Sequence, residues 1–523
     1  MKLIPSTPRP TGSYWCSWRT QRLMVSGPII MSKFHDRSYY RKELCKTLND
    51  AWLFDDPGLL SKFMHNIRGD VYALLDDGWD IPYIDENGNK DHEQIGSCIP
   101  NPERFPYGDT PAERLRIISD KVKELGYAGL GLWIPHQAHF EKKDDILPLD
   151  KFYDYWAERA RWFAYADVKY VKVDWGHHNS HGREYFYESR KTMTRAFRDF
   201  CPDVTVEHYV ISGQFFKPLP GERRDIAKKI HNIADVCRLY DISPSFNTVT
   251  TLNRVAEMMS LVGDDSTCLF CAGEDPYIAA TLGMTMGMMS HPFISQTTLF
   301  LRPDQFKDGI YDTKVLRSDF YDYTWYERAL YWQRICPPVP FGETENKTSD
   351  TTLTDTWFYN REPYPYNASK VMGRLLEQSA PAAIARNTEL PIAEGGEHLP
   401  YLTAFQHPTE KAYAIGMLQR TVDGVMNCTV PPARVKAFPM DTENTIGIFG
   451  PCEYIDLVFD KDVREMKVFL CGMLDEEAED VTDSVTFPEF NTVRISGELL
   501  SAKGLAGQFP FDHSEPACVM KLV

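Results

Sequence analysis

The sequence predicts an α/β protein: a (β/α)8 TIM barrel followed by an antiparallel β-sandwich. Over the first 300 residues, short apolar strands alternate with amphipathic helices, and this pattern indicates a parallel sheet. Eight strand–helix units are the number that closes a barrel. Beyond residue 395 the pattern changes to short alternating runs of apolar and polar residues, which predicts antiparallel strands. Because 523 residues are too many for one compact core, we expect two domains, 1–395 and 396–523.

The barrel strands are predicted from short apolar runs that end in polar or turn-forming residues. In chain order they cover residues 13–18, 70–76, 127–134, 169–175, 203–210, 234–240, 266–272 and 291–295. The clearest of the helices between them is 110–126, where Thr-Pro begins a helically spaced apolar pattern and a glycine ends it. The methionine-rich run 284–291 is expected to form the buried side of a barrel helix.

The chain between the barrel and the sandwich differs in composition. Residues 300–365 are rich in aromatic, proline and acidic residues, and we expect them to form a long insertion on the top face of the barrel. A helix is expected to follow at 367–379. The strands of the sandwich are predicted at 411–421, 453–460, 465–473 and 491–500.

Charge and composition narrow the classes of partner. A formal charge of −17 without a basic run argues against nucleic acid and favours an uncharged or cationic ligand. No run approaches the roughly 18 apolar residues of a membrane span, and prolines stand where a signal peptide would be apolar. The twelve cysteines are scattered, so we expect a cytoplasmic protein with mostly free thiols, Cys268 and Cys271 included. The sequence is also compatible with a homo-oligomer.

A lysine and an aspartate, Lys172 and Asp174, interrupt an otherwise apolar strand. Side chains alternate along a strand, so Val171 and Val173 point to one face and the two charged residues to the other. In a barrel of this kind the active site lies at the carboxyl ends of the strands. Lys172 and Asp174 are therefore expected to point into the mouth, while the valines pack against the outer helices.

Three further candidate strands end in charged residues. These residues are Asp76 and Asp77, then Glu207, then Arg238 with Asp241. A single acid often caps the helix that follows a strand, but four strand ends in succession meet at one place. A polar pocket is therefore the better interpretation.

Two carboxylates from different strands could flank a glycosidic bond, one attacking the anomeric carbon and the other protonating the leaving oxygen. Asp174 fits the nucleophile because Lys172, on the same face, favours its ionised form. The acid needs a shielded, neutral carboxyl. Asp241 is the best placed candidate, with Asp225 and Asp235 as weaker alternatives.

Together these segments resemble clan D of the glycoside hydrolases, chiefly family 27 and more loosely family 36, which include α-galactosidases and α-N-acetylgalactosaminidases. The similar motifs follow the family's order over most of the barrel. They are TGSYWCSW at 11–18, YALLDDGW at 72–79, FPYGDTPAERLRIISDKVKELGYAGLGLWI at 105–134, FAYADVKYVKVDWG at 163–176 and EDPYIAATLGMTMGMMSHPFISQT at 274–297.

The resemblance implies a retaining, exo-acting α-galactosidase with Asp174 as the nucleophile and Asp241 as the acid/base. It also implies substrate-binding residues: Asp76 and Asp77 on O4 and O6, Lys172 and Arg238 on other hydroxyls, Glu207 near O2, Trp133, Trp175 and Asp275 lining the pocket, and Trp18 or Trp79 stacked on the ring. No cofactor or metal is implied, and the partner is a carbohydrate substrate. A glutamate near O2 favours an unsubstituted 2-hydroxyl.

Other functions stay open. Within the clan they are an α-N-acetylgalactosaminidase and a transglycosylase that moves galactose to another sugar. From other classes they are a non-catalytic carbohydrate-binding relic and a metal-dependent barrel enzyme. The histidines His177, His178 and His181 could suggest a metal site, but no carboxylate accompanies them at a known zinc spacing. We expect them to be hydrogen-bond donors beside the sugar pocket.

Overall fold

The computed structural model describes most of the chain. The described residues are 1–18, 20–21, 48–55, 58–80, 96–141, 144–209, 221–239, 248–289, 324–358, 375–396, 398–421, 433–505 and 515–523.

Eight parallel strands form the sheet of the first domain, in the order β7-β6-β5-β4-β3-β2-β1-β8. Their bounds are β1 Tyr14–Cys16, β2 Tyr72–Leu75, β3 Gly129–Ile134, β4 Tyr170–Val173, β5 Thr205–Tyr209, β6 Val236–Arg238, β7 Leu269–Cys271 and β8 Gly287–Met288. Thr285, just before β8, bridges in parallel to Cys271 of β7, which brings the two ends of the sheet together. The predicted (β/α)8 barrel is confirmed.

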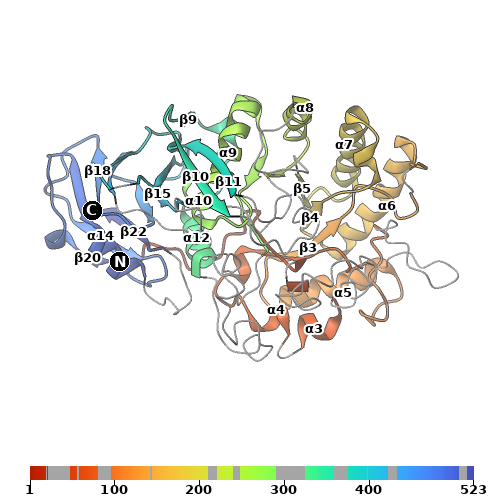
Figure 1. The fold of residues 1–523 in the computed structure, drawn as a ribbon. Coiled ribbons are helices and arrows are strands. Elements are labelled where there is room, and N and C mark those ends of the chain that lie inside the picture. The colour runs from red at the N-terminus through yellow and green to blue at the C-terminus, as the bar shows by residue number, and fades with distance from the viewer. Residues whose placement is uncertain are drawn as a thin grey trace.

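Helices follow the strands and lie on the outside of the sheet (Figure 1). They are α3 Asp50–Phe54, α4 Leu59–Lys62, α5 Pro111–Glu124, α6 Leu149–Ala166, α7 Arg183–Phe200, α8 Gly221–Ile230, α9 Thr248–Val262, α10 Pro276–Thr281 and α12 Thr324–Ile335. Helix α5 begins where the sequence predicts. The Thr110 hydroxyl accepts the Glu113 N–H, the Glu113 carboxylate accepts the Thr110 N–H, and Pro111 takes the first helical position.

The two faces of β4 differ as expected. Val171 and Val173 belong to the apolar core between strands and helices. Tyr170, on the opposite face, belongs to a second buried cluster inside the barrel. The members of this cluster are Tyr14, Cys16, Trp18, Leu74, Trp133, Tyr170, Val236, Cys271 and Met289. Lys172 shares the face of Tyr170 and is fully buried, so the charged residues of β4 lie on the interior side.

The second domain is a sandwich of two sheets. The larger has the order β20-β19-β22-β17-β15-β14-β12-β9 and the smaller β13-β16-β18-β21. The strands are β9 Asn346–Thr348, β12 Ala383–Arg386, β13 Ile392–Glu394, β14 Tyr401–Gln406, β15 Ala412–Leu418, β16 Arg434–Met440, β17 Thr445–Phe449, β18 Tyr454–Phe459, β19 Val468–Gly472, β20 Glu479–Asp480, β21 Thr492–Ser496 and β22 Ala517–Leu522, with one helix, α14 Gly497–Gly504. Ile415 and Ile448 of the larger sheet share one core with Val435 and Leu457 of the smaller sheet.

The sandwich is confirmed, but its sheets are mixed rather than purely antiparallel. The pairs β12–β14, β15–β17 and β16–β18 are parallel. The reason lies in the connections. After β15 the chain crosses to β16 in the other sheet before it returns as β17 beside β15, so β15 and β17 run in the same direction.

Three predictions about the middle of the chain are wrong for the residues that the structure describes. Residues 324–358 are not an insertion on the barrel, because α12 packs against α10 and β9 joins the sandwich. Residues 375–381 form β11, not a helix, since they pair along their whole length with β10, Thr352–Phe358. Strands β9 and β12 both precede residue 396, so the larger sheet begins before the predicted domain limit.

The run from Met284 to Met289 is a strand segment rather than the face of a helix. Gly283 has a φ of +57°, a left-handed conformation that suits glycine, and it follows α10. The chain then extends beside β1 and β7 to form β8. The predicted eighth strand, 291–295, lies outside the described residues.

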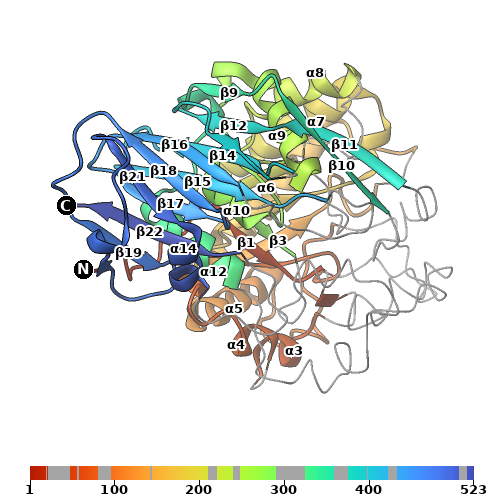
Figure 2. The ribbon, with the colours of Figure 1, turned by 60° about the vertical axis from the view of Figure 1, so that its left-hand side comes forward.

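The two domains are joined by buried contacts. Arg386 of β12 donates to the carbonyls of Gly283 at 3.1 Å, Val339 at 2.9 Å and Pro340 at 2.8 Å. The hairpin of β10 and β11 lies against α9 (Figure 2), where the Asn253 amide donates to the Ser379 carbonyl at 2.8 Å. The second domain therefore contacts the side of the barrel formed by β7 and β8.

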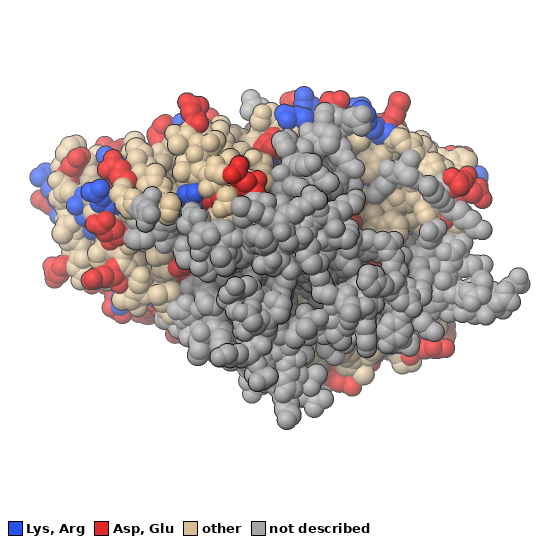
Figure 3. Space-filling view, in the orientation of Figure 1, with Lys and Arg blue, Asp and Glu red and all other residues tan. Residues whose placement is uncertain are grey.

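The described surface and thiols complete the fold. Over the sandwich, on the left of Figure 3, acidic side chains lie interspersed with lysines and arginines. Every cysteine in the described part of the chain is a free thiol. None of the described helices is long and apolar enough to cross a membrane.

Candidate active site

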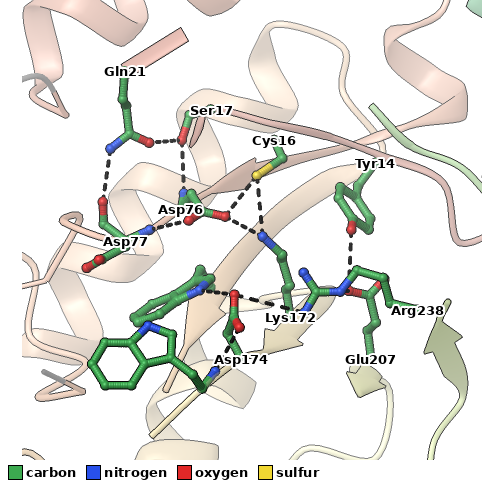
Figure 4. Close-up of polar contacts among 12 residues, drawn as sticks. Tyr14, Cys16, Ser17, Gln21, Asp76, Asp77, Lys172, Asp174, Glu207 and Arg238 are labelled. Atoms are coloured by element: carbon green, nitrogen blue, oxygen red, sulfur yellow. Dashed lines mark hydrogen bonds and ion pairs between the residues drawn. The ribbon is translucent and has the colours of Figure 1, made fainter. Parts of the chain in front are cut away.

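The carboxyl ends of β2, β4, β5 and β6 bring the predicted charged residues together (Figure 4). The strand register explains this. Lys172 of β4 is the partner of both Trp133 on β3 and Glu207 on β5, so these side chains lie at one level of the barrel. Asp174 follows β4 directly, and Arg238 ends β6.

The Asp174 carboxylate is held on both oxygens. Oδ2 accepts the indole N–H of Trp133 at 2.8 Å, and Oδ1 accepts the backbone N–H of Trp175 at 2.7 Å. A guanidinium nitrogen of Arg238 lies 3.9 Å from Oδ2. Burial alone would raise the pKa of Asp174, but Arg238, Lys172 and the two N–H donors hold it below the usual value. The carboxylate is therefore ionised and ready to act as a nucleophile or an acceptor.

Lys172 and Asp76 form a buried ion pair beside it. The distance from Nζ to Oδ2 of Asp76 is 2.6 Å, and both side chains are almost completely excluded from solvent. The Cys16 thiol donates to the same Oδ2 at 2.9 Å and lies 3.9 Å from Nζ. Burial would lower the pKa of Lys172, but Asp76 outweighs it and keeps the pKa above the usual value. Lys172 is thus charged.

The turn after β2 is fixed by a small polar network. Oδ1 of Asp76 accepts the Asp77 N–H at 2.8 Å, and the Ser17 hydroxyl accepts the Asp76 N–H at 2.9 Å. Gln21 accepts the Ser17 hydroxyl proton and donates to the Asp77 carbonyl at 2.9 Å. Asp76 therefore has both oxygens engaged within the protein, whereas the side chain of Asp77 is partly exposed.

Glu207 lies deeper in the barrel. Its side chain is fully buried, and its oxygens accept the hydroxyls of Tyr170 at 2.7 Å and Tyr14 at 3.3 Å. Arg238 lies 3.3 Å away and so bridges Glu207 and Asp174. Burial raises the pKa of Glu207, although Arg238 and Tyr170 oppose this. Glu207 therefore forms an ion pair with Arg238 inside the barrel and is not exposed to solvent.

The tryptophans divide between two places. Trp18 and Trp133 belong to the cluster inside the barrel, and Trp175 packs against it. Trp79 is buried in the core on the helix side, where its indole N–H donates to the Trp133 carbonyl at 2.8 Å. Of the two candidates for stacking on a sugar ring, Trp18 is therefore the one inside the barrel.

Of the three acid/base candidates, the structure describes only Asp225 and Asp235. Asp241 lies outside the described residues. Asp225 is exposed on α8, on the outside of the barrel. Asp235 precedes β6 at the opposite end of the strand, where it pairs with Arg198 at 2.7 Å and accepts the Val206 N–H at 2.7 Å. Asp235 thus lies away from the carboxyl ends of the strands, and Asp225 lies on an outer helix.

Asp275 immediately precedes α10, after the carboxyl end of β7. It accepts a hydrogen bond from the Thr251 hydroxyl. Burial, with the charge of the adjacent Glu274, raises the pKa of Asp275 to about 7. Glu274 itself accepts the Met289 N–H at 2.9 Å. Glu274 and Asp275 are thus two adjacent acids after the carboxyl end of β7, and Glu274 lies beside the end of β8.

His178, after β4, links the loop after β4 to the loop after β3. His178 is fully buried, and its Nε2 lies 2.7 Å from a carboxylate oxygen of Glu141 in the loop after β3. A Cβ on Gly176 would come within 2.2 Å of the His136 carbonyl oxygen, so only glycine allows this close approach. No group of three or more histidines, cysteines or acids suited to a metal occurs in the described part of the chain.

No model of a known protein family matches this chain, and no curated protein matches it. Solved structures are similar over most of its length. They include α-galactosidase I from Mortierella vinacea, 9% identical, covering 98% of this chain and 97% of that chain with a TM-score of 0.39. An α-galactosidase from Saccharomyces cerevisiae is 10% identical, with coverages of 100% and 97% and a TM-score of 0.38. A glucosidase from Croceicoccus marinus is 10% identical, with coverages of 87% and 89% and a TM-score of 0.31.

Sequence reasoning missed several residues that touch the predicted set, including Tyr14, Cys16, Tyr170 and Arg190. Tyr14, Cys16 and Tyr170 lie on the interior faces of β1 and β4, and strict alternation from Lys172 could have indicated Tyr170. Arg190 lies on α7 and reaches the strand end from outside. No local pattern in the sequence distinguishes it.

Proposed function

We propose that this protein is a retaining glycoside hydrolase that removes α-linked galactosyl residues through a glycosyl-enzyme formed on Asp174. The observation that carries the proposal is the state of Asp174 at the carboxyl end of β4. Its carboxylate is ionised, held by Trp133 and Trp175, and accompanied by Arg238 and Lys172. A fixed carboxylate with a lowered pKa is what a nucleophile of this reaction needs.

The reaction would proceed in two displacements. In the first, an oxygen of Asp174 forms a bond to the anomeric carbon while the glycosidic C–O bond breaks and the leaving oxygen takes a proton from the acid. In the second, water attacks the same carbon, the bond to Asp174 breaks, and the water proton passes to the same acid, now acting as a base. Asp241 remains the candidate for this role on the resemblance to family 27.

Sugar recognition would come from the charged residues around Asp174. Arg238 and Lys172 are proposed to donate to ring hydroxyls, and Trp18 to pack on the apolar face. Asp77 is more exposed than Asp76, whose oxygens already accept from Lys172, Cys16 and the Asp77 N–H. We therefore assign the hydroxyl contact chiefly to Asp77 and give Asp76 the role of fixing Lys172.

The test compares hydrolysis of an aryl α-galactoside and an aryl α-N-acetylgalactosaminide by the wild type and by Asp174→Ala, with proton NMR of the released anomer. The proposal expects α-galactose from the wild type and none from the variant. A β product, or turnover that survives in the variant, would contradict it. Preferred cleavage of the acetamido substrate would favour an α-N-acetylgalactosaminidase, and transfer to an added acceptor sugar would favour a transglycosylase.

Two control experiments distinguish the proposed hydrolase from a metal-dependent enzyme and from a non-catalytic carbohydrate-binding protein. Activity that persists in the presence of a chelator would argue against a metal-dependent enzyme. Binding of galactose without any hydrolysis, measured by calorimetry on the wild type, would indicate a carbohydrate-binding protein that lacks catalysis.

A further inference from the structure

A buried arginine reaches the main chain of Asp174 from the side opposite to the interior of the barrel. Arg190 lies on α7 and is fully buried. Its Nη2 donates to the carbonyl oxygen of Asp174 at 3.0 Å. The Asp174 N–H donates to the Ile134 carbonyl at 2.9 Å. The backbone of Asp174 is therefore held by β3 on one side and by α7 on the other.

The guanidinium of Arg190 is itself held in place. It lies 4.5 Å from the ring centres of both Phe186 and Tyr209. Its Nη1 donates to Nδ1 of His208 at 2.8 Å, and Nε2 of His208 lies 2.7 Å from the Thr194 hydroxyl. Because a guanidinium only donates, Nδ1 of His208 must be the acceptor and Nε2 must carry the proton.

In the described part of the chain, no acid lies next to the positive charge of Arg190. Burial, with the charge of Arg190, lowers the pKa of His208 far below the usual value, so His208 is neutral. No carboxylate among the described residues forms an ion pair with Arg190. A buried cation is costly unless something compensates it, and the anion whose main chain it contacts is Asp174.

We propose that Arg190 is a positioning residue of this reaction, which fixes the Asp174 main chain and favours the free carboxylate over the glycosyl ester. The inference rests on the proposed function. In the second displacement the bond between the anomeric carbon and the Asp174 oxygen breaks, and its electron pair returns to the carboxylate. A nearby cation stabilises the negative charge that develops, and so it speeds hydrolysis of the ester.

The test uses stopped-flow kinetics with an aryl α-galactoside that has a good leaving group, so that the first displacement is fast. In Arg190→Gln, kcat and KM are expected to fall together by about tenfold, while kcat/KM changes by less than about threefold. A burst of aryl alcohol close to the enzyme concentration should precede the steady state. Arg190→Lys keeps the charge and should restore much of kcat and reduce the burst.

The matched control is Arg195→Gln. Arg195 lies on the same helix and stacks on the Tyr153 ring at 4.4 Å, but it is exposed. Its replacement should leave kcat, KM and the burst as in the wild type. A second variant, Thr194→Val, removes one of the two hydrogen-bond partners of His208 and leaves Arg190 in place. It should show the same joint fall of kcat and KM on a smaller scale.

A purely structural role would lower kcat/KM or the folded fraction without a burst, and that result would overturn the proposal. If Arg190→Gln does not fold, Thr194→Val decides, and wild-type kinetics in that variant would overturn it. A wild type that does not hydrolyse the α-galactoside would overturn the proposed function and this inference with it. A wild type that does, with unaltered Arg190 variants, would overturn the inference alone.

Discussion

The indole N–H of Trp133 donates to Oδ2 of Asp174 at 2.8 Å, from β3 to the end of the neighbouring strand β4. Both residues are buried, so the hydrogen bond is made to a charged oxygen away from bulk water. Such bonds are about twice as strong as those between neutral groups. The contact both orients the carboxylate and lowers its pKa.

Trp133→Phe removes this donor and keeps most of the ring. A hydrogen bond to a charged group contributes about 1.5–3 kcal/mol, so kcat/KM should fall by about 10- to 100-fold. The pKa of Asp174 should rise, so the acid limb of the kcat/KM profile should move to higher pH. The pH profile measures both effects.

Trp156→Phe is the matched control for that variant. Trp156 is fully buried on α6, in the core between strands and helices, and its indole N–H has no hydrogen-bond partner among the described residues. It should shift neither kcat/KM nor the acid limb. An unshifted acid limb in Trp133→Phe would show that the bond to Asp174 does not set the pKa.

Lys172→Met breaks the buried pair with Asp76. An uncompensated Asp76 is left inside the barrel, and breaking such a pair costs about 3–5 kcal/mol. The double variant Lys172→Met/Asp76→Asn removes both charges and should recover part of this loss. Denaturant unfolding measures the free energy of each variant.

The exposed pair of Lys467 and Asp480 provides the comparison. It has the same residue types at 2.8 Å, but its side chains are 65% and 36% exposed. Lys467→Met should cost less than about 1 kcal/mol. Equal losses in Lys467→Met and Lys172→Met would mean that burial of the Lys172 pair contributes nothing.

Asp275 should make stability depend on pH near neutrality. Burial, with the charge of Glu274, raises the pKa of Asp275 to about 7 in the folded protein, whereas in the unfolded chain an aspartate titrates near pH 4. Between about pH 4 and 7 the folded state binds more protons, so this group lowers stability as the pH rises, and the loss is complete above pH 7. Asp275→Asn should therefore gain in melting temperature over the wild type between pH 5 and pH 8.

Asp480→Asn is the control for the pH series. Its partner Lys467, with Thr482, lowers the pKa of Asp480 to about 2, so it does not titrate between pH 5 and 8. The difference in melting temperature between this variant and the wild type should be constant over that range. A constant difference for Asp275→Asn as well would mean that Asp275 does not titrate between pH 5 and 8, and it would contradict the prediction.

Much of the site follows from one regularity. Strand alternation placed Lys172 and Asp174 on the face opposite Val171 and Val173. The barrel then brought Glu207 to the level of Lys172, and it brought Arg238 close to both Glu207 and Asp174. These predictions depend only on local pattern and on the geometry of a parallel sheet. They were accessible without any knowledge of tertiary contacts.

Other features depend on contacts that no local pattern reveals. The sequence predicts a helix that includes residues 375–379, but pairing with β10 makes 375–381 a strand. Gly287–Met288 of β8 is too short to show an alternation. Arg190 lies among other arginines on α7, and only the packing of that helix against β4 and β5 sets it apart. Long-range packing decides each of these cases.

The central claim is that Asp174 carries the sugar during catalysis. The most direct measurement is to incubate the wild type with an activated fluorinated galactosyl donor that slows the second displacement, and then to locate the attached sugar by peptide mass spectrometry. The account predicts one galactosyl group, attached to Asp174. A label on another carboxylate such as Asp77 or Glu207, or full turnover of α-galactosides with no covalent species, would contradict it.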